Sequence, residues 1–365
     1  MSRIQQIFAQ YGPEYLARFG DRIPGAHRKL IGAITNCRSG ALGRHLYECP
    51  DCAERHVANS SCGNRHCPIC QNEKADRWLQ KQMAKLLPCP YFFVTFTVPE
   101  ALRRFLRAHQ AVGYEVLFTA AATALKRLAA EKRFCGCHTA GFLGVLHTWG
   151  RTLGYHPHLH FIVPGGGLDK EGTRWVPSRR SDFFVHVHPL SHLFQALFKK
   201  AMHQAGLFEQ ISPKVWEQDW NVNTQAVGNG RGSLKYLAPY VFRVAISDAR
   251  IRSVRDGRVR FSYRKVNSKV WRSMQLDAIE FMRRFLQHTL PAGFMKIRHY
   301  GFLAARTKLP VQRVRELICV LYELIGKIFP VPKPKPKYKP LCCGKCGTRM
   351  RWVRFIPPPF AAAPG

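Results

Sequence analysis

A hairpin near the middle of the chain constrains the fold more than any other feature of the sequence. Residues 141–149 and 155–164 are both rich in apolar, aromatic and β-branched side chains and are bounded by glycines, a pattern typical of strands. Only Gly150 to Gly154 separate them, so the two strands are expected to pair antiparallel. A further strand, residues 91–98, is apolar on both faces and is therefore expected in the interior of a sheet.

The second strand of this hairpin carries the candidate ligands of a catalytic metal. His158 and His160 are two residues apart, so their side chains project from one face of the strand and Leu159 from the other. Two imidazoles side by side on a rigid strand suit a divalent metal. His147 lies across the turn and is the candidate third ligand. The alternatives are histidines satisfied by neighbours in a core and, for His147, a residue that is simply paired in the sheet.

Two other segments offer rival metal ligands. His186 and His188 repeat the same spacing in a short predicted strand, residues 183–188, which Pro189 ends at once. This short strand lacks a neighbouring strand that would pair with it as well as 141–149 pairs with 155–164. His186 and His188 are therefore the second choice as ligands of the catalytic metal. Residues 135–138 read Cys-Gly-Cys-His and offer a further metal site, although a plain loop is the favoured interpretation.

The cysteines predict bound zinc. Thirteen cysteines in a chain whose N-terminus lacks an apolar secretory core indicate a cytoplasmic, metal-binding protein rather than a disulfide-bonded one. Two C-x-x-C pairs, Cys49/Cys52 and Cys67/Cys70, predict one closed four-thiolate zinc site. A second zinc site is expected from Cys37 and Cys62 together with one or both of His45 and His66. The alternative for His66 is a contact with DNA.

A further C-x-x-C pair, Cys343/Cys346, follows an alternating Pro/Lys segment at residues 332–337 that is expected to be an extended linker. One such pair supplies only two ligands. It therefore either finds partners elsewhere in the chain or is vestigial.

The net charge predicts the partner. The chain has 57 Lys and Arg against 22 Asp and Glu, a net charge of +35, which is too large for an ordinary solvated surface and indicates a polyanion. The sequence contains no apolar run of the roughly 18 residues that span a membrane, so nucleic acid is the expected partner. The candidate DNA-binding residues are Arg65, Arg231, Lys235 and Arg243.

Two tyrosines are the candidate nucleophiles. Tyr236 and Tyr240 follow Ser233, a good N-cap, and their spacing places both hydroxyls on one side of a continuous helix. Pro239 lies between them and is expected to kink that helix. The alternative is a pair of aromatic core residues.

These motifs together resemble the rolling-circle, two-tyrosine HUH transposases of the IS91-like family of bacterial insertion sequences. The resemblance covers nearly the whole chain and rests on these stretches: SCGNRHCPICQ at 61–71, LHTWG at 146–150, HPHLH at 156–160, KYLAPYVFRVAIS at 235–247, EFMRRF at 280–285, LP at 290–291 and RHYGF at 298–302.

The resemblance implies an α+β fold with an RRM-like antiparallel sheet and flanking helices. It places His158 and His160 on a central strand and the tyrosines on a helix beneath. It also implies that a tyrosine attacks single-stranded DNA at the ends of an insertion sequence and forms a 5′-phosphotyrosine. Magnesium or manganese at the histidines assists, and an N-terminal zinc-binding domain recognises the ends.

Four parts are expected on this basis. Residues 1–90 hold an N-terminal helix and the zinc-binding domain, and residues 91–265 hold the HUH nuclease domain, with strands at 241–246 and 259–263. Residues 266–330 are a basic, mostly helical region, and residues 331–365 are the Pro/Lys linker with the C-terminal cysteine pair.

Two rival functions remain open from the sequence. A rolling-circle replication initiator or relaxase uses the same chemistry on a plasmid or phage origin. A non-catalytic zinc DNA-binding regulator would use the histidines for structural zinc, but it needs neither tyrosine.

Overall fold

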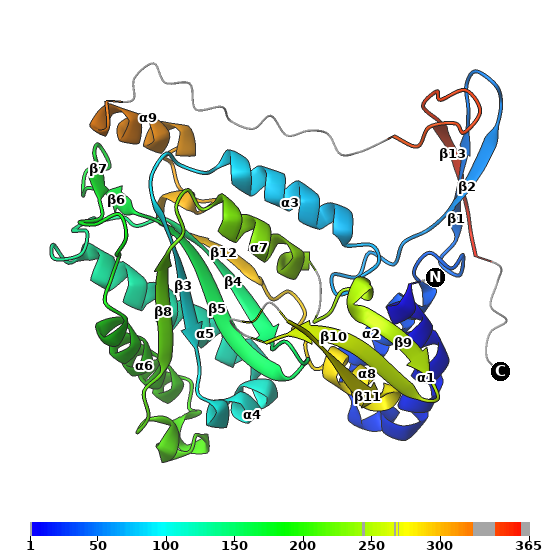
Figure 1. The fold of residues 1–365 in the computed structure, drawn as a ribbon, viewed down its shortest axis with the longest axis horizontal. Coiled ribbons are helices and arrows are strands. Elements are labelled where there is room, and N and C mark those ends of the chain that lie inside the picture. The colour runs from blue at the N-terminus through cyan, green and yellow to red at the C-terminus, as the bar shows by residue number, and fades with distance from the viewer. Residues whose placement is uncertain (1, 243–244, 266–267, 269, 324–339, 359–365) are drawn as a thin grey trace.

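The structure, a computed structural model, describes residues 2–242, 245–265, 268, 270–323 and 340–358 (Figure 1). Its helices are α1 (Arg3–Phe19), α2 (Gly25–Asn36), α3 (Asn72–Ala84), α4 (Glu100–Ala108), α5 (Gln110–Ala130), α6 (Val187–Gln204), α7 (Arg231–Phe242), α8 (Ala278–Leu286) and α9 (Val311–Leu321). Short 3₁₀ helices are η1 (Gly20–Arg22), η2 (Phe208–Gln210), η3 (Pro213–Val215), η4 (Asp248–Arg250) and η5 (Gly301–Leu303).

The strands are β1 (Arg44–Glu48), β2 (Arg55–Asn59), β3 (Tyr91–Thr97), β4 (Phe142–Trp149), β5 (Tyr155–Pro164), β6 (Gly166–Leu168), β7 (Trp175–Pro177), β8 (Asn221–Ala226), β9 (Ile251–Arg255), β10 (Arg258–Arg264), β11 (Trp271–Asp277), β12 (Ile297–Tyr300) and β13 (Arg351–Ile356). Helices and antiparallel sheets are mixed along the chain, so the α+β class is confirmed.

A five-stranded antiparallel sheet in the order β12-β4-β5-β3-β8 forms the centre of the molecule. The predicted hairpin is confirmed, because β4 and β5 pair antiparallel with His147 opposite His158. Along the chain, four of these strands and their helices follow the order β3–α4/α5–β4–β5–α6–β8, a β-α-β-β-α-β succession. The strand with the two histidines, β5, therefore lies in the middle of the sheet.

Helices cover both faces of this sheet, which explains why its strands are apolar on both sides. On one face Phe96, Leu146 and Phe161 pack into a core with α4, α5 and α6. On the other face Val145 and Ile162 pack with residues of α3 and α7, the two helices drawn in front of the sheet in Figure 1. The histidines face this second side, since His160 lies opposite Val145 in the register.

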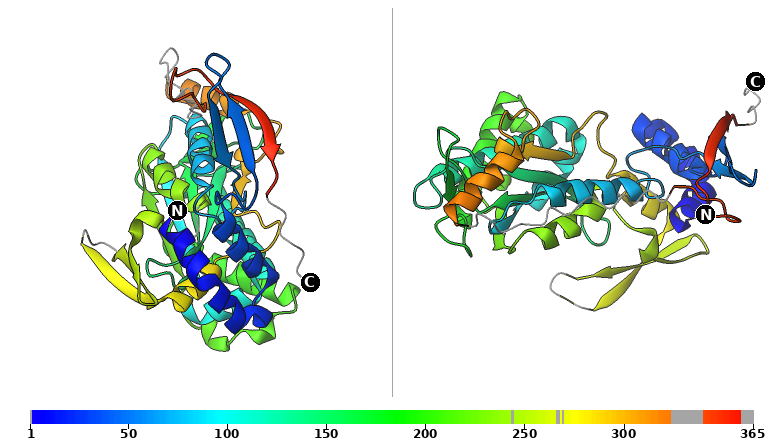
Figure 2. Two further views of the ribbon diagram at one scale, coloured as in Figure 1. Left: turned by 90° about the vertical axis from the view of Figure 1, so that its right-hand side faces the viewer. Right: turned by 90° about the horizontal axis from the view of Figure 1, so that it is seen from above.

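A second core joins the N-terminal helices to a segment far away in the sequence. Residues of α1 and α2 share a buried cluster with β9, β10 and α8. Within it, the rings of Phe8 and Phe285 are 5.2 Å apart. Figure 2 shows these elements together at one end of an elongated molecule, with the β9-β10-β11 sheet projecting from it.

A third, small sheet brings the two ends of the chain together. Its order is β13-β1-β2, so the C-terminal strand pairs directly with a strand of the N-terminal module. In Figure 1 it stands apart from the central sheet, at the upper right. We call these three strands, with the turns at residues 49–54 and 343–348, the ribbon.

Several sequence-based assignments were wrong. The predicted strand at 183–188 is not formed, because helix α6 begins at Val187 and buries Leu190, Phe194 and Phe198 at helical spacing. Of the predicted strand at 241–246, residues 241–242 are the end of α7, residues 245–246 are in neither a helix nor a strand, and 243–244 lie outside the described residues. The region 266–330 is expected to be mostly helical, but its described part contains β11 and β12, which are held by pairing with β10 and β4.

Among the described residues, no helix combines the length and the apolar character needed to cross a membrane. The Pro/Lys segment at 332–337 lies outside the described residues.

Candidate metal centres and catalytic site

Three histidines come together on one face of the central sheet. His147 on β4 and His158 and His160 on β5 each offer a ring nitrogen, and these nitrogens lie within 4.8 Å of one another. The ring centroids of His147 and His160 are 4.6 Å apart, and those of His158 and His160 are 4.7 Å apart. The hairpin register alone produces this grouping. Three imidazoles around one point are a suitable donor set for a divalent cation.

Hydrogen bonds orient two of these rings. Nδ1 of His158 is 2.7 Å from the carbonyl oxygen of His156. A carbonyl oxygen only accepts, so this Nδ1 carries the proton and Nε2 keeps its lone pair. Nδ1 of His160 is 3.0 Å from the hydroxyl of Thr95 on β3. Partners of this kind fix the ring orientation of metal-binding histidines.

Burial keeps the three rings neutral. Loss of solvation lowers the pKa of His158 to about 4 and the pKa of His147 and His160 well below the usual value, and the neighbouring histidines lower the latter two further. A neutral imidazole is the form that binds a metal. The cluster is therefore ready to accept a cation at neutral pH.

Helix α7 brings one of the predicted tyrosines to this cluster. Gly230 precedes α7 with φ +72° and lies so close to Tyr91 that a Cβ would come within 2.8 Å of its ring. Leu234 and Leu237 of α7 are buried against the sheet. Tyr236 is half exposed, and its ring centroid lies 6.3 Å from that of His160 in an edge-to-face arrangement. Tyr240 follows one turn later on α7, and its side chain lies outside the described residues.

A partly buried lysine near the histidines was not predicted from the sequence. The ammonium of Lys296 lies 4.6 Å from the ring centroid of Trp149, whose ring stacks on His147. Burial, and then the charge of Arg65, lowers the pKa of Lys296 to about 7. The sequence gives no signal for it, because the residue lies in a short irregular segment before β12. Thr95 was missed for a similar reason, since its role appears only when β3 pairs with β5.

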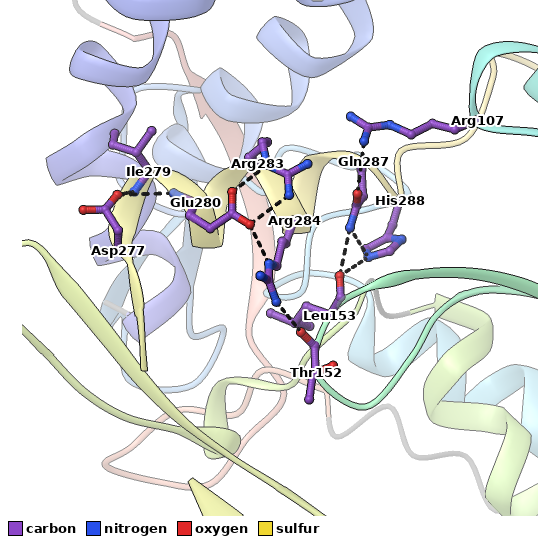
Figure 3. Close-up of polar contacts among 10 residues, drawn as sticks. All are labelled: Arg107, Thr152, Leu153, Asp277, Ile279, Glu280, Arg283, Arg284, Gln287 and His288. Carbon is purple, nitrogen blue, oxygen red and sulfur yellow. Dashed lines mark hydrogen bonds and ion pairs between the residues drawn. The ribbon is translucent and has the colours of Figure 1, made fainter. Parts of the chain in front are cut away.

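Helix α8 anchors the turn of the histidine hairpin (Figure 3). Leu153, in that turn, has φ +65°, which a non-glycine residue rarely adopts. Its carbonyl oxygen accepts a hydrogen bond from Gln287 Nε2 at 2.8 Å and lies 3.2 Å from His288 Nε2. Arg284 donates to the carbonyl of Thr152 at 3.3 Å. These contacts hold the turn, and with it the register that aligns the histidines.

The first cysteine cluster lies at the base of the β1–β2 hairpin and consists of Cys37, Cys62, Cys67 and Cys70. Their sulfur atoms lie within 4.8 Å of one another. Hydrogen bonds from Cys62 and Cys67 lower the pKa of the Cys70 thiol to about 2. Four converging thiols form a closed set of the kind that binds structural zinc.

The second cluster lies at the opposite end of the same hairpin and consists of Cys49, Cys52, Cys343 and Cys346. The predicted single site combining Cys49/Cys52 with Cys67/Cys70 is therefore wrong. The first pair is in the turn between β1 and β2, and the second pair follows β2 back at the base. Five strand residues separate the two ends by about 17 Å, so one ion cannot bind both pairs.

The two histidines proposed as zinc ligands have other roles. His66 is buried, and its Nε2 accepts a hydrogen bond from the backbone N–H of Leu290 at 3.1 Å, which ties the first cysteine cluster to the segment after α8. His45 on β1 accepts a hydrogen bond from Trp352 Nε1 at 3.3 Å and packs against Phe355. Neither belongs to a cysteine cluster.

The rival metal sites do not assemble among the described residues, where the two cysteine clusters and the histidine triad are the groups with metal-binding geometry. Cys135 and Cys137 donate to the backbone carbonyls of Val176 and Ala129. The ring of His186 packs against Phe134 and Phe183.

The candidate DNA-binding residues lie on different elements. Arg231 and Lys235 are exposed on α7. Arg65 is exposed in the zinc module, where its guanidinium donates to the carbonyl of Phe294 at 2.8 Å. Arg243 lies outside the described residues.

Comparisons with known proteins place this geometry in context. The family model described as "Putative transposase" matches residues 141–310, and the model described as "Transposase zinc-binding domain" matches residues 7–98. The chain is 36% identical over 349 residues to a putative transposase (y4qJ) of Sinorhizobium fredii, covering 90% of this chain and 85% of that one. It is 28% identical over 355 residues to the transposase for insertion sequence element IS801 of Pseudomonas savastanoi pv. phaseolicola, covering 90% and 83%. No solved structure gives a significant match.

Proposed function

The chain belongs to the IS91-like family of insertion-sequence transposases with an N-terminal zinc-binding domain, and from this premise we propose that it cuts and rejoins single-stranded DNA at the ends of an insertion sequence through a 5′-phosphotyrosine. The observation that carries the proposal is the position of Tyr236 beside the triad of His147, His158 and His160. A nucleophile and a metal-binding site on one face of a rigid sheet are the two components that phosphodiester cleavage requires.

The fold supports the same proposal. The β-α-β-β-α-β order of the central sheet is that expected of an RRM-like HUH domain, and β5 occupies a central position in it. A central strand flanked on both sides is held more firmly than an edge strand or a loop, so its side chains are well placed for catalysis.

The chemistry follows from the residues. The hydroxyl oxygen of Tyr236 or Tyr240 attacks the scissile phosphorus, and a new phosphorus–oxygen bond forms while the bond to the 3′ oxygen breaks. The phenol proton leaves to solvent, and the departing 3′ oxygen takes up a proton. A magnesium or manganese ion at the three histidines would stabilise the charge on the non-bridging oxygens as a Lewis acid. The phosphotyrosine ester conserves the bond energy, so the 3′-hydroxyl of another end reverses the step without ATP.

Two tyrosines one helical turn apart on α7 suit an exchange of strands, because one can hold a cleaved end while the other cuts a second. The zinc-binding domain is proposed to recognise the ends of the element. The exposed Arg231 and Lys235 on the same helix are proposed to contact phosphates along the bound strand.

A covalent-adduct assay tests this function. Purified protein is incubated with labelled single-stranded oligonucleotides covering both flanks of its gene, with manganese or with a chelator. The expected result is a protein–DNA adduct that survives denaturation and requires the metal. His158→Ala and His160→Ala should abolish the adduct while retaining DNA binding. Cleavage that leaves no covalent adduct would contradict the proposal.

A further inference from the structure

The second cysteine cluster is built from the two ends of the chain. Cys49 and Cys52 come from the turn between β1 and β2, and Cys343 and Cys346 come from the turn before β13. The sulfur atoms of Cys49 and Cys346 are 3.4 Å apart, those of Cys52 and Cys343 are 3.5 Å apart, and those of Cys52 and Cys346 are 3.6 Å apart. A tetrahedral zinc with Zn–S bonds of about 2.3 Å places its sulfur ligands about 3.8 Å from one another. The cluster is therefore close to the size that zinc requires.

The backbones of the two turns are built alike, and both carry the same C-x-x-C spacing. In the first turn, the N–H of Cys49 donates to the carbonyl of Glu54 at 2.8 Å, and the N–H of Ala53 donates to the carbonyl of Cys49 at 3.0 Å. In the second, Cys343 donates to Thr348 at 2.8 Å, and Gly347 donates to Cys343 at 3.0 Å.

The backbone dihedrals of the two turns agree as well. Ala53 and Gly347 occupy the same place, four residues after the first cysteine of each turn, and have φ of +55° and +76°. An alanine with positive φ is strained, and a requirement to direct two thiols at one point accounts for it. Two matching turns that face each other form a symmetric four-thiolate site.

Contacts around the cluster fasten the two turns together. The hydroxyl of Thr348 donates to the carboxylate of Asp51, and the ammonium of Lys345 pairs with Glu54. Beyond the turns, β13 pairs with β1. The apolar residues buried with this cluster are few: Cys49, Cys343 and Met350, with Tyr47 and Leu341 partly buried. So small a core does not hold three strands by itself, and a metal would contribute much of the missing folding energy.

We propose that Cys49, Cys52, Cys343 and Cys346 bind a second structural zinc ion, which fixes the C-terminal tail to the N-terminal module and completes the ribbon. The matched zinc-binding domain, residues 7–98, contains only half of these ligands. The site is thus shared between that domain and a segment nearly 300 residues later in the chain. This inference does not depend on the cleavage chemistry.

Zinc content of the full-length protein tests the proposal directly. Cys343→Ser/Cys346→Ser is expected to contain one zinc ion fewer per chain than the wild type. Cys342→Ser is the matched control, because Cys342 is an exposed neighbour that lies outside the cluster; it should retain the wild-type zinc content. A double variant that keeps the wild-type zinc content would overturn the proposal.

Thiol alkylation of the wild type avoids any dependence on how the variant folds. Cys52, Cys342 and Cys346 are all exposed, so without zinc all three thiols are accessible to iodoacetamide. In zinc-loaded protein, Cys342 should react and Cys52 and Cys346 should be protected until a chelator is added. Equal labelling of Cys342 and Cys346 in protein that retains its zinc would show that the cluster holds no metal. A Cys49–Cys346 or Cys52–Cys343 disulfide in protein purified under reducing conditions would also rule out the zinc site.

Discussion

At the scale of single residues, the histidine triad depends on neighbours that hold its rings rather than on the histidines alone. The carbonyl of His156 and the hydroxyl of Thr95 each contact an Nδ1 atom and leave an Nε2 atom for a ligand. Such partners raise the basicity of the ligand and fix its orientation. The sequence predicts the histidines through their spacing, but it does not predict Thr95, whose position depends on the pairing of β3 with β5.

Thr95→Val should weaken the metal site without unfolding the sheet, because valine keeps the shape of threonine and removes only the oxygen that contacts His160. The expected loss is about 10- to 100-fold in apparent affinity for manganese, with nicking partly restored by excess metal. Thr97→Val is the control, since Thr97 pairs with His158, whose Nδ1 contacts a backbone carbonyl instead. The measurement is nicking activity as a function of manganese concentration for both variants and the wild type. Identical curves for Thr95→Val and wild type would contradict a role of Thr95 in holding His160.

At the scale of secondary-structure elements, the histidine hairpin and the ribbon are each held by a partner distant in sequence. Arg284 of α8 and Gln287, which follows α8, donate hydrogen bonds to backbone carbonyls of the β4–β5 turn (Figure 3). Glu280 holds Arg284 and Arg283 with hydrogen bonds of 2.7 and 2.5 Å. The N-terminus of α8 is capped by Asp277, whose carboxylate accepts from Ile279 N–H at 2.9 Å. The hairpin itself could be predicted because its signals are local, whereas its anchor could not.

Glu280→Gln should destabilise the protein in a pH-dependent way. Hydrogen bonds from Arg283, then Arg284, lower the pKa of Glu280 to about 2. A folded-state pKa below the unfolded value stabilises the protein above about pH 4.5, and this contribution disappears as the pH falls to about 2. The expected difference in stability at neutral pH is about 1 kcal/mol, since the pair is partly exposed.

Thermal unfolding of wild type and Glu280→Gln between pH 2 and 7 checks this, and the difference in Tm should close at the acid end. Glu316→Gln, which removes an exposed ion pair with Arg313 on α9, should show little effect. A constant difference across this range would mean that the carboxylate charge is not responsible.

The outer strand of the ribbon is a candidate contact for DNA. Arg351, Trp352, Arg354 and Phe355 on β13 are all exposed, a combination of cations and aromatic rings that suits phosphates and bases. Arg351→Ala/Arg354→Ala should weaken binding and make the slope of log affinity against log salt shallower by about 1.4 for single strands. Lys170→Ala/Lys214→Ala removes the same charge from exposed sites outside the ribbon and is the control; equal effects of the two double variants on binding would exclude a specific contact.

At the scale of the whole molecule, the chain folds back so that its two ends meet in the ribbon. Composition alone predicts bound metal from the thirteen cysteines and a nucleic-acid partner from the net charge of +35. Neither prediction requires knowledge of the structure. The sequence also identifies most of the cysteines that the structure groups into clusters. It does not predict their grouping, because the β1–β2 hairpin separates Cys52 from Cys67 and the partners of Cys52 lie at the far end of the sequence. Short strands such as β12 were missed because pairing, not periodicity, defines them.

The net charge predicts that single-stranded DNA binding falls steeply with salt. Lysines and arginines displace counterions from the strand, and the log–log slope is about −0.7 for each phosphate neutralised. Affinity measured between about 50 and 200 mM salt should therefore drop by orders of magnitude if six or more phosphates are contacted. An affinity that stays flat over this range would exclude a mainly electrostatic interface.

The central claim is that a tyrosine on α7 becomes joined to DNA beside the histidine triad, and mapping the adduct by mass spectrometry tests it most directly. The wild-type protein is reacted with its cognate single strand and manganese, then digested with protease and nuclease. A nucleotide is expected on the peptide that contains Tyr236 and Tyr240, attached through a 5′ phosphate. Tyr236→Phe/Tyr240→Phe should give no adduct while binding DNA normally, because phenylalanine keeps the ring and loses only the oxygen. An adduct on any other residue, or metal-dependent nicking by the double variant, would contradict the account.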